Sequence, residues 1–275
     1  MAGSLRPGNA LPGIVLYAAV YTIVAGDDWS VAGCVGGGIL VLLAQGIVTI
    51  HNDIADRDID RTNRRTDIPL AAGSISEGLL AQYAVFLSVG ATVVAVCIGL
   101  LTALWLSVYL LLGWMYSGPL GLKNRPVCSL ATLGICYGGM PWMLGFVAAQ
   151  HAPSLVEWLL VAASTVFAAG VTSLKDFKDV AGDKQHGKRT FLLVFGEAGV
   201  RRLIVGASIA AGCAVTAALW PQTPGMWGLL VCFMFIAACV VRADLTHVRT
   251  RKRIGFWLRM TWAVYVIWAL SMVVK

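Results

Sequence analysis

The stretch GLLAQYAVFLSVGATVVAVCIGLLTALWLSVYLLLGWMYSGPLGL, residues 78–122, contains no charged residue. A helix needs about 20 apolar residues to cross the hydrocarbon core of a bilayer. The stretch is too long for one such helix, so it is predicted to hold two, with a break near Gly99–Thr102. This pattern indicates an integral membrane protein built of helices.

Apolar segments of similar length occur on both sides of this stretch. They are Leu11–Ala25, Val31–Ile50, Val127–Ala149, Leu155–Leu174, the two parts of Leu203–Val241 that Pro221–Gly225 separates, and Gly255–Val274. With the first two helices they predict an all-α bundle of about nine transmembrane helices, forming a single domain over residues 1–275.

The composition supports a membrane location. Of the 275 residues, 58% are hydrophobic and only 13% are charged, whereas soluble domains carry roughly 25% charged residues. A soluble enzyme, a disordered chain and a nucleic-acid-binding domain are therefore excluded. The net charge of +7 is better explained by the basic loops that set the topology of membrane proteins.

The basic residues predict the orientation. In a nine-helix topology, all but one of the 21 Lys and Arg residues fall on the side of the N-terminus. Cytoplasmic loops carry the excess of Lys and Arg. The N-terminus and the loops on its side are therefore expected in the cytoplasm, and the C-terminus with Lys275 on the opposite side.

Two acidic segments lie on this basic side, one expected as a loop after the second helix and one after the sixth. Both have the spacing DxxDxxxD, formed by Asp53, Asp56 and Asp60 and by Asp176, Asp179 and Asp183. Positions i, i+3 and i+7 share one face of a helix. Each triplet is therefore predicted to form a stripe of carboxylates at a cytoplasmic helix end, and the two stripes are expected to face each other. Asp58 lies off the stripe and is expected on the solvated surface.

Six converging carboxylates repel one another unless a cation neutralises them. Oxygen ligands suit a hard cation, and Mg²⁺ commonly joins protein carboxylates to substrate phosphates. Basic side chains near the motifs are available for the remaining phosphate charge: Arg64, Arg65, Lys123, Arg125, Lys175 and Lys188. These features predict a diphosphate site at the membrane surface, above an apolar bundle that suits a substrate with an apolar tail.

The two motifs, Asn52-Asp53-x-x-Asp56-x-x-x-Asp60 and Asp176-x-x-Asp179-x-x-x-Asp183, resemble the aspartate-rich motifs of the UbiA superfamily of intramembrane prenyltransferases. The resemblance extends over residues 51–76 and 173–191. It also includes Arg6-Pro7-x-Asn9 before the first helix, and Tyr116-Ser117 with Lys123 after the fourth. Ile68 departs from the family pattern, which usually has Arg there, and Arg64 or Arg125 is the expected replacement for that charge.

The resemblance implies a fold, a reaction and a set of site residues. The fold is the nine-helix bundle, with the two motifs in a cytoplasmic cap. The reaction is Mg²⁺-dependent transfer of an isoprenyl group from an isoprenyl diphosphate to a lipophilic acceptor, expected to be aromatic, through an allylic cation. The implied catalytic and metal-binding residues are Asp53, Asp56, Asp60, Asp176, Asp179 and Asp183, with Asn52 as a further metal ligand. The implied diphosphate-binding residues are Asn52, Arg64, Arg65, Lys123, Arg125, Lys175 and Lys188, and the implied pocket residues are Asn9, Tyr116, Tyr137 and Trp142.

Two other functions stay open at this stage. A terpene cyclase on the same scaffold would ionise the diphosphate in the same way, but would capture the cation with a double bond of the substrate itself. A transporter of an anionic solute is the third hypothesis. Against it, the predicted helices are almost uncharged, whereas transport paths place polar groups near the middle of the membrane.

Three further features carry predictions. Gly36–Gly38 and Gly138–Gly139 are expected to permit close helix packing. The basic cluster Arg249–Arg253 is expected to contact anionic lipid headgroups. If the prenyl tail lies inside the bundle, a larger side chain at Ala44 or Gly138 should shorten the preferred tail.

Overall fold

The computed structural model describes residues 5–219 and 226–274, and within them all regular secondary structure is helical. The long helices are α1 (Pro7–Ala25), α2 (Val31–Ala55), α4 (Glu77–Ile98), α5 (Leu100–Ser117), α6 (Pro126–Gly134), α7 (Met140–Ala148), α8 (Leu155–Thr172), α10 (Phe191–Ala218), α11 (Met226–Arg242) and α12 (Val248–Val273). The shorter ones are η2 (Gly26–Asp28), α3 (Arg57–Thr62), η3 (Leu122–Asn124), η4 (Ile135–Gly139), η5 (Ser173–Lys178) and α9 (Val180–Gln185). The predicted break at Pro221–Gly225 and the terminal Lys275 lie outside the described residues.

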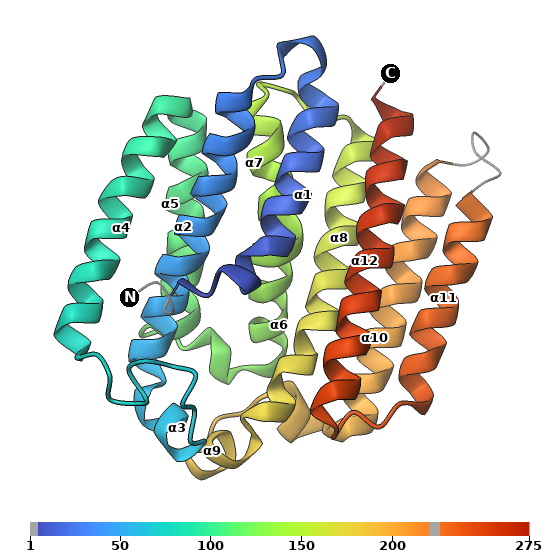
Figure 1. Cartoon of the computed structure of the whole chain (residues 1–275). Coiled ribbons are helices and arrows are strands. Elements are labelled where there is room, and N and C mark those ends of the chain that lie inside the picture. Colours follow the sequence, from blue (N-terminus) through green and yellow to red (C-terminus); the bar gives the residue numbers. More distant parts are fainter. Residues whose placement is uncertain (1–4, 220–225, 275) are drawn as a thin grey trace.

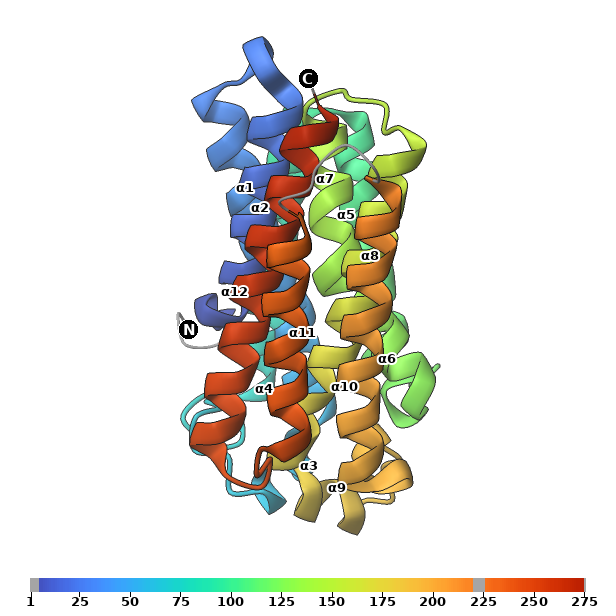
Figure 2. The same ribbon diagram turned by 90° about the vertical axis from the view of Figure 1, so that its right-hand side faces the viewer.

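The long helices stand side by side in one bundle, with α3 and α9 at one end and the end of α12 at the other (Figures 1 and 2). Among the described residues, eight helical segments are long and apolar enough to cross a membrane. They coincide with the predicted spans except for α11, which has 17 residues and falls just short. The all-α membrane fold is thus confirmed.

The predicted break inside residues 78–122 is present. Helix α4 ends at Ile98, α5 begins at Leu100, and Gly99 alone separates them. The fifth span is also interrupted, because α6 and α7 are joined by η4, a π-helical turn. Such turns are rare and often occur at functional sites.

The glycines of the fifth span allow close packing, as predicted. A Cβ atom on Gly138 would lie 2.3 Å from the carbonyl oxygen of Ser164 in α8, and one on Gly134 would lie 2.6 Å from that of Thr165. In the same way, Gly37 leaves room for the ring of Tyr17. A larger side chain at Gly138 would therefore separate the helices. The sequence predicted that a larger residue at Gly138 would shorten the preferred prenyl tail. The structure indicates that such a residue would first disturb the packing of the helices.

Three boundaries differ from the prediction. Helix α2 continues through His51–Ala55, which was expected to be loop. Helix α10 begins at Phe191 rather than Leu203, because Thr190 caps it by accepting a hydrogen bond from the Leu193 amide. Helix α12 begins at Val248 rather than Gly255. Mostly polar residues extend α2 and α12, whereas the extension of α10 begins with an apolar turn, residues 191–195, that a kink at Gly196 separates from the rest of the helix.

The basic cluster before the last span is only partly a surface feature. Arg251 is 9% exposed, donates hydrogen bonds to the carbonyl oxygens of Leu245 and Thr246, and lies over the ring of Phe177. Arg249, Lys252 and Arg253 are not buried in this way. The lipid contact predicted for the whole cluster is therefore wrong for Arg251, which supports the second aspartate segment through Phe177.

Candidate active site

Both aspartate segments change direction at their middle aspartate. Helix α2 ends at Ala55 and α3 starts at Arg57, with Asp56 between them at φ −99°, ψ 10°. The 3₁₀-helix η5 and α9 are separated in the same way by Asp179, at φ −114°, ψ 9°. The predicted continuous carboxylate stripe is therefore wrong, because each triplet is split between two helical pieces.

The carboxylates nevertheless gather at one end of the bundle, where α3 contacts α9. Five of the six are buried, with exposed fractions of 1–6%: Asp53, Asp56, Asp60, Asp176 and Asp183. Asp179 is partly buried. The side chain of Asp58, by contrast, is 64% exposed and pairs only with neighbouring arginines, which confirms its predicted surface position.

A single side chain links the two short helices. Asn63, directly after α3, donates from Nδ2 to the carbonyl oxygen of Asp179 at 3.2 Å and accepts at Oδ1 from the Gly182 amide at 2.7 Å. A Cβ atom on Gly182 would lie 2.5 Å from Asn63 Nδ2 and 2.8 Å from the carbonyl oxygen of Ile59, so a side chain there would push the two short helices apart. This joint fixes the first motif against the second.

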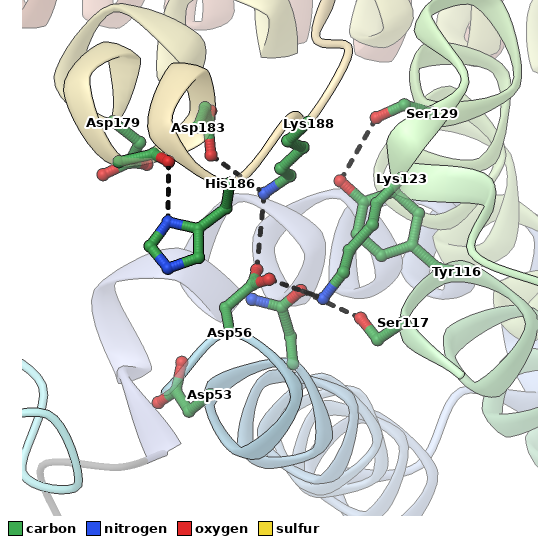
Figure 3. Close-up of polar contacts among 12 residues, drawn as sticks. Asp53, Asp56, Tyr116, Ser117, Lys123, Ser129, Asp179, Asp183, His186 and Lys188 are labelled. Carbon is green, nitrogen blue, oxygen red and sulfur yellow. Dashed lines mark hydrogen bonds and ion pairs between the residues drawn. The ribbon is translucent and has the colours of Figure 1, made fainter. Parts of the chain in front are cut away.

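Lys188 connects the carboxylates of the two motifs (Figure 3). Its Nζ lies 3.4 Å from Asp56 Oδ2 and 3.3 Å from Asp183 Oδ1. Lys123 approaches the same aspartate from the loop after α5, with Nζ 2.8 Å from Asp56 Oδ1. One carboxylate thus lies between two lysines that come from distant parts of the chain.

Two arginines neutralise other members of the cluster. Arg6 Nη2 donates to both carboxylate oxygens of Asp53, at 2.7 and 2.8 Å. Arg65 donates to Asp179 and also to Asp67, at 2.8 Å in each case. Charge-assisted pairs of this kind stabilise carboxylates that burial would otherwise destabilise.

Polar side chains from α2, α5, α6 and η5 complete the rim. Asn52 Oδ1 accepts a hydrogen bond from Ser117 Oγ at 2.9 Å and lies 3.5 Å from Lys123 Nζ. Lys175 Nζ donates to the Tyr116 hydroxyl at 2.5 Å, and that hydroxyl lies 3.2 Å from Ser129 Oγ. Four helices therefore meet around these contacts.

The electrostatics of the cluster follow from burial and pairing. Burial favours protonation of Asp56, but Lys188 and Lys123 outweigh it and hold its pKa below the usual value. Asp60 has no lysine partner, so burial and the neighbouring charge of Asp56 raise its pKa to about 7. Burial also raises the pKa of Asp183. The cluster thus contains carboxylates that an added cation would stabilise in the ionised form.

The residues fit a divalent cation by their chemistry. Within residues 5–219 and 226–274, no three His, Cys, Asp or Glu side chains form a ready-made metal site, because the carboxylates are held by lysines and arginines. Two buried oxygens, Asp56 Oδ1 and Asp183 Oδ1, have lysine ammonium groups as their charged neighbours, Lys123 at 2.8 Å and Lys188 at 3.3 Å, which a divalent cation could replace. Such oxygens keep lone pairs for a hard cation.

Not every predicted site residue reaches the cluster. Arg64 and Arg125 are exposed and form no ion pair in the described part of the chain, and Ile68 is buried, so the replacement of its missing charge by either arginine stays a prediction. Asn9 is also exposed. Trp142 is fully buried in the apolar core, where its indole donates to Ser164.

Some residues of the site were not selected from the sequence. Arg6 belonged to a quoted motif but was not assigned to the site, and Asn63 sits in a polar stretch that gives no specific signal. Gln45 is buried within α2, where its Nε2 donates to the Tyr137 hydroxyl at 2.7 Å. A polar residue inside a predicted span was a usable signal for it.

The fold and site define a multi-pass membrane protein with paired aspartate-rich segments at one end of a helical bundle. The family model of the UbiA prenyltransferase family matches residues 10–272. The chain therefore belongs to this family, and it is an enzyme of the prenyltransferase class.

Similar proteins of known name differ in their products. The digeranylgeranylglyceryl phosphate synthase of Natronomonas pharaonis is 32% identical over 82% of this chain and 77% of its own length. The homogentisate phytyltransferase of Synechocystis sp. is 24% identical over 84% and 78%. The bacteriochlorophyll synthase 33 kDa chain of Cereibacter sphaeroides is 29% identical over 62% of this chain, which spans only 57% of that relative.

Solved structures show the same fold. A UbiA homologue from Archaeoglobus fulgidus bound to GPP and Mg²⁺ has a TM-score of 0.76 at 17% identity, covering 98% of both chains. The apo structure of a UbiA homologue from Aeropyrum pernix has a TM-score of 0.73 at 20% identity, covering 93% of this chain and 96% of that one. At these identities the likeness concerns the fold.

Proposed function

We propose that this protein is a Mg²⁺-dependent prenyltransferase that moves the isoprenyl group of an isoprenyl diphosphate onto a lipophilic acceptor. The contact of Lys188 with both Asp56 and Asp183 carries the proposal. It brings the two motifs within the span of one ammonium group, which is the scale of a cation–phosphate site. The related structures that hold isoprenyl diphosphates with Mg²⁺ support it.

The proposed ligands for Mg²⁺ are the six aspartates and Asn52. Bound Mg²⁺ would supply Lewis-acid stabilisation of the charge that develops on the diphosphate. The chain's own cations would turn from the carboxylates to the phosphate oxygens as the substrate enters. Lys123, Lys188 and Arg65 already lie at the carboxylates that the diphosphate would approach.

The reacting carbon is expected directly below the carboxylates, near Tyr116. This residue is 8% exposed and faces the bundle interior, with Lys175 Nζ 5.1 Å from its ring centroid. Apolar walls on either side would exclude water from an allylic cation. The Lys175–Tyr116 hydrogen bond fixes the ring so that it can flank the reacting carbon.

The acceptor is expected to be lipophilic and to enter from the bilayer or its cytoplasmic rim. Relatives are named for homogentisate, bacteriochlorophyll and digeranylgeranylglyceryl phosphate, so the acceptor differs within the family. We also propose that the aspartate end of the bundle faces the cytoplasm and the end of α12 the opposite side. The one-sided distribution of Lys and Arg supports this orientation.

The test is to incubate the purified protein and Mg²⁺ with isoprenyl diphosphates of increasing length, with and without a panel of phenolic and glycerol-phosphate acceptors. Prenylated acceptor that disappears in EDTA is the expected product. Cyclic hydrocarbon formed without any acceptor would instead identify a terpene cyclase. Diphosphate moved intact into proteoliposomes, with no bond broken, would identify a transporter.

A further inference from the structure

Beneath the rim, three helices supply a second layer of polar side chains. The hydroxyl of Tyr109 in α5 donates to Gln45 Oε1 at 2.8 Å, and Gln45 Nε2 donates to the Tyr137 hydroxyl at 2.7 Å. Gln45 and Tyr109 are buried, at 5% and 4% exposure. The layer therefore joins α2, α5 and the π-helical turn η4 across the inside of the bundle.

The second layer comes from the same chain segments as the rim but lies deeper in the bundle. Asn52 in α2, Tyr116 in α5 and Ser129 in α6 belong to the rim, and each lies seven or eight residues from a member of the second layer on the same chain segment. Residues i and i+7 share a helix face. At 1.5 Å per residue the two layers are about 10–12 Å apart.

The π-helical turn aims Tyr137 into the bundle. On the side toward α8, Gly138 and Gly139 leave no room for a side chain, since Cβ atoms there would lie 2.3 Å from Ser164 O and 2.9 Å from Thr165 Oγ1. Tyr137 lies on the side toward α2, where its hydroxyl accepts the hydrogen bond from Gln45. It is only partly buried, so part of its surface is left for a ligand to cover.

Burial differs above and below this layer. Between the two layers, Thr49, Leu112 and Leu133 lie three or four residues from members of both layers and are only partly buried. One turn below, Val41, Trp105 and Met140 are each 5–6% exposed, and the Trp105 indole donates to the Met140 carbonyl oxygen at 2.8 Å. These residues thus leave little exposed surface below the second layer.

We propose that Gln45, Tyr109 and Tyr137 form the floor of the prenyl-tail site and select isoprenyl diphosphates with a tail of about two isoprene units. An extended isoprene unit has four backbone carbon–carbon bonds of about 1.5 Å and is about 5 Å long. The distance between rim and floor holds about two such units. A longer tail would have to displace a hydrogen-bonded layer that rests on buried side chains.

The inference rests on the proposed function, and its test separates the two. Tyr137→Ala and Gln45→Ala remove floor volume, whereas Tyr137→Phe keeps the ring and removes only the hydroxyl. We measure kcat/KM and direct binding for diphosphates of two, three, four and five isoprene units. The ratio of four-unit to two-unit kcat/KM is expected to rise at least about tenfold in both Ala variants and to change less than about threefold in Tyr137→Phe.

Tyr265→Ala is the matched control. This tyrosine is also hydrogen-bonded, to the Gly212 carbonyl oxygen in the other half of the bundle, and it is fully buried, so its loss should lower stability without changing the length ratio. If both Ala variants bind and turn over substrate with an unchanged length ratio, the proposed floor is wrong, while the proposed prenyltransferase function stands. A parent protein that neither binds nor converts any isoprenyl diphosphate would overturn both.

Discussion

The two aspartate segments have the same spacing but different local structures. The first begins as the last turn of α2 and continues in α3, whereas the second begins as a 3₁₀-helix and continues in α9. Their pairing also differs. The first motif contacts Arg6, Lys123 and Lys188, while the second contacts Lys188 and Arg65.

What the segments share is the break at the middle aspartate. Asp56 and Asp179 adopt nearly the same φ and ψ, and each is followed by a six-residue helix that carries the third aspartate. The break turns that helix across the end of the bundle, so the third carboxylate faces the other motif. Spacing alone therefore does not place the carboxylates on one face; the helix–break–helix geometry does.

The largest expected effect comes from the aspartate that lies between two lysines. Asp56→Ala should lower turnover at least about 1000-fold, because it removes a proposed metal ligand and leaves Lys123 and Lys188 without their shared partner. Asp179→Ala, which removes the same position of the second motif, should be comparable if the two motifs act as a pair. Steady-state assays at saturating Mg²⁺ make the measurement.

Asp58→Ala is the control, since this exposed carboxylate lies two residues after Asp56, in α3. It should stay within about twofold of the parent, as surface substitutions usually do. A loss at Asp58 as large as that at Asp56 would contradict the assignment of the site to the buried carboxylates.

The lysines provide the second comparison, because Lys188 contacts both motifs and Lys123 only the first. Lys188→Met should lower kcat/KM by about 100-fold and Lys123→Met by less, since a cation at a developing diphosphate charge contributes to transition-state binding. Circular dichroism and thermal unfolding should show that both variants fold. Equal losses in the two variants would contradict a greater role for Lys188 through its contact with both motifs.

The sequence was sufficient for the bundle but not for the joint between the motifs. The uncharged run of residues 78–122 predicted α4, α5 and their break, since spans are recognised from apolar length alone. The burial of five aspartates could be anticipated from their convergence. The role of Asn63 could not, because it depends on backbone atoms of Asp179 and Gly182, which are distant in sequence.

The wrong predictions were made from local sequence patterns, which do not show breaks in a helix or partners distant in sequence. A periodic pattern assumes a continuous helix, yet Asp56 and Asp179 interrupt it, and Gly196 in α10 has φ 69° inside an otherwise helical segment. Likewise, the basic charge of Arg249–Arg253 predicted contact with lipid headgroups. In the structure Arg251 is buried and donates hydrogen bonds to backbone carbonyl oxygens. Local sequence does not reveal such tertiary partners.

The joint itself gives the third prediction. Asn63→Ala removes the hydrogen bonds of Asn63 with Asp179 and Gly182, so the motifs should lose their fixed separation while each keeps its own carboxylates. We expect kcat/KM to fall about tenfold, mainly through a higher KM for the diphosphate. Thr62→Ala is the neighbouring control, because its hydroxyl bonds only within α3. A loss confined to kcat with KM unchanged would argue against a positioning role.

The smallest effect is expected from pH, and it distinguishes Asp60 from Asp56. The pKa of Asp60 is raised to about 7, first by burial and then by the charge of Asp56, while the pKa of Asp56 is lowered by its lysines. Metal binding requires the ionised carboxylate. The apparent affinity for Mg²⁺ should therefore rise about tenfold between pH 6 and pH 8, as Asp60 loses its proton.

The raised pKa of Asp60 has the opposite effect on the stability of the metal-free protein. Its contribution to stability falls with rising pH, whereas the affinity for Mg²⁺ rises. A carboxyl whose pKa is raised from 3.8 to about 7 on folding binds more protons in the folded state, so its contribution falls as pH rises between these values. Asp60→Asn should remove that fall, and the difference in Tm between variant and parent should grow from about pH 4 to pH 7. Calorimetry of both proteins with and without Mg²⁺ measures it. A Tm difference independent of pH would mean that Asp60 is ionised throughout and that its environment resembles that of Asp56.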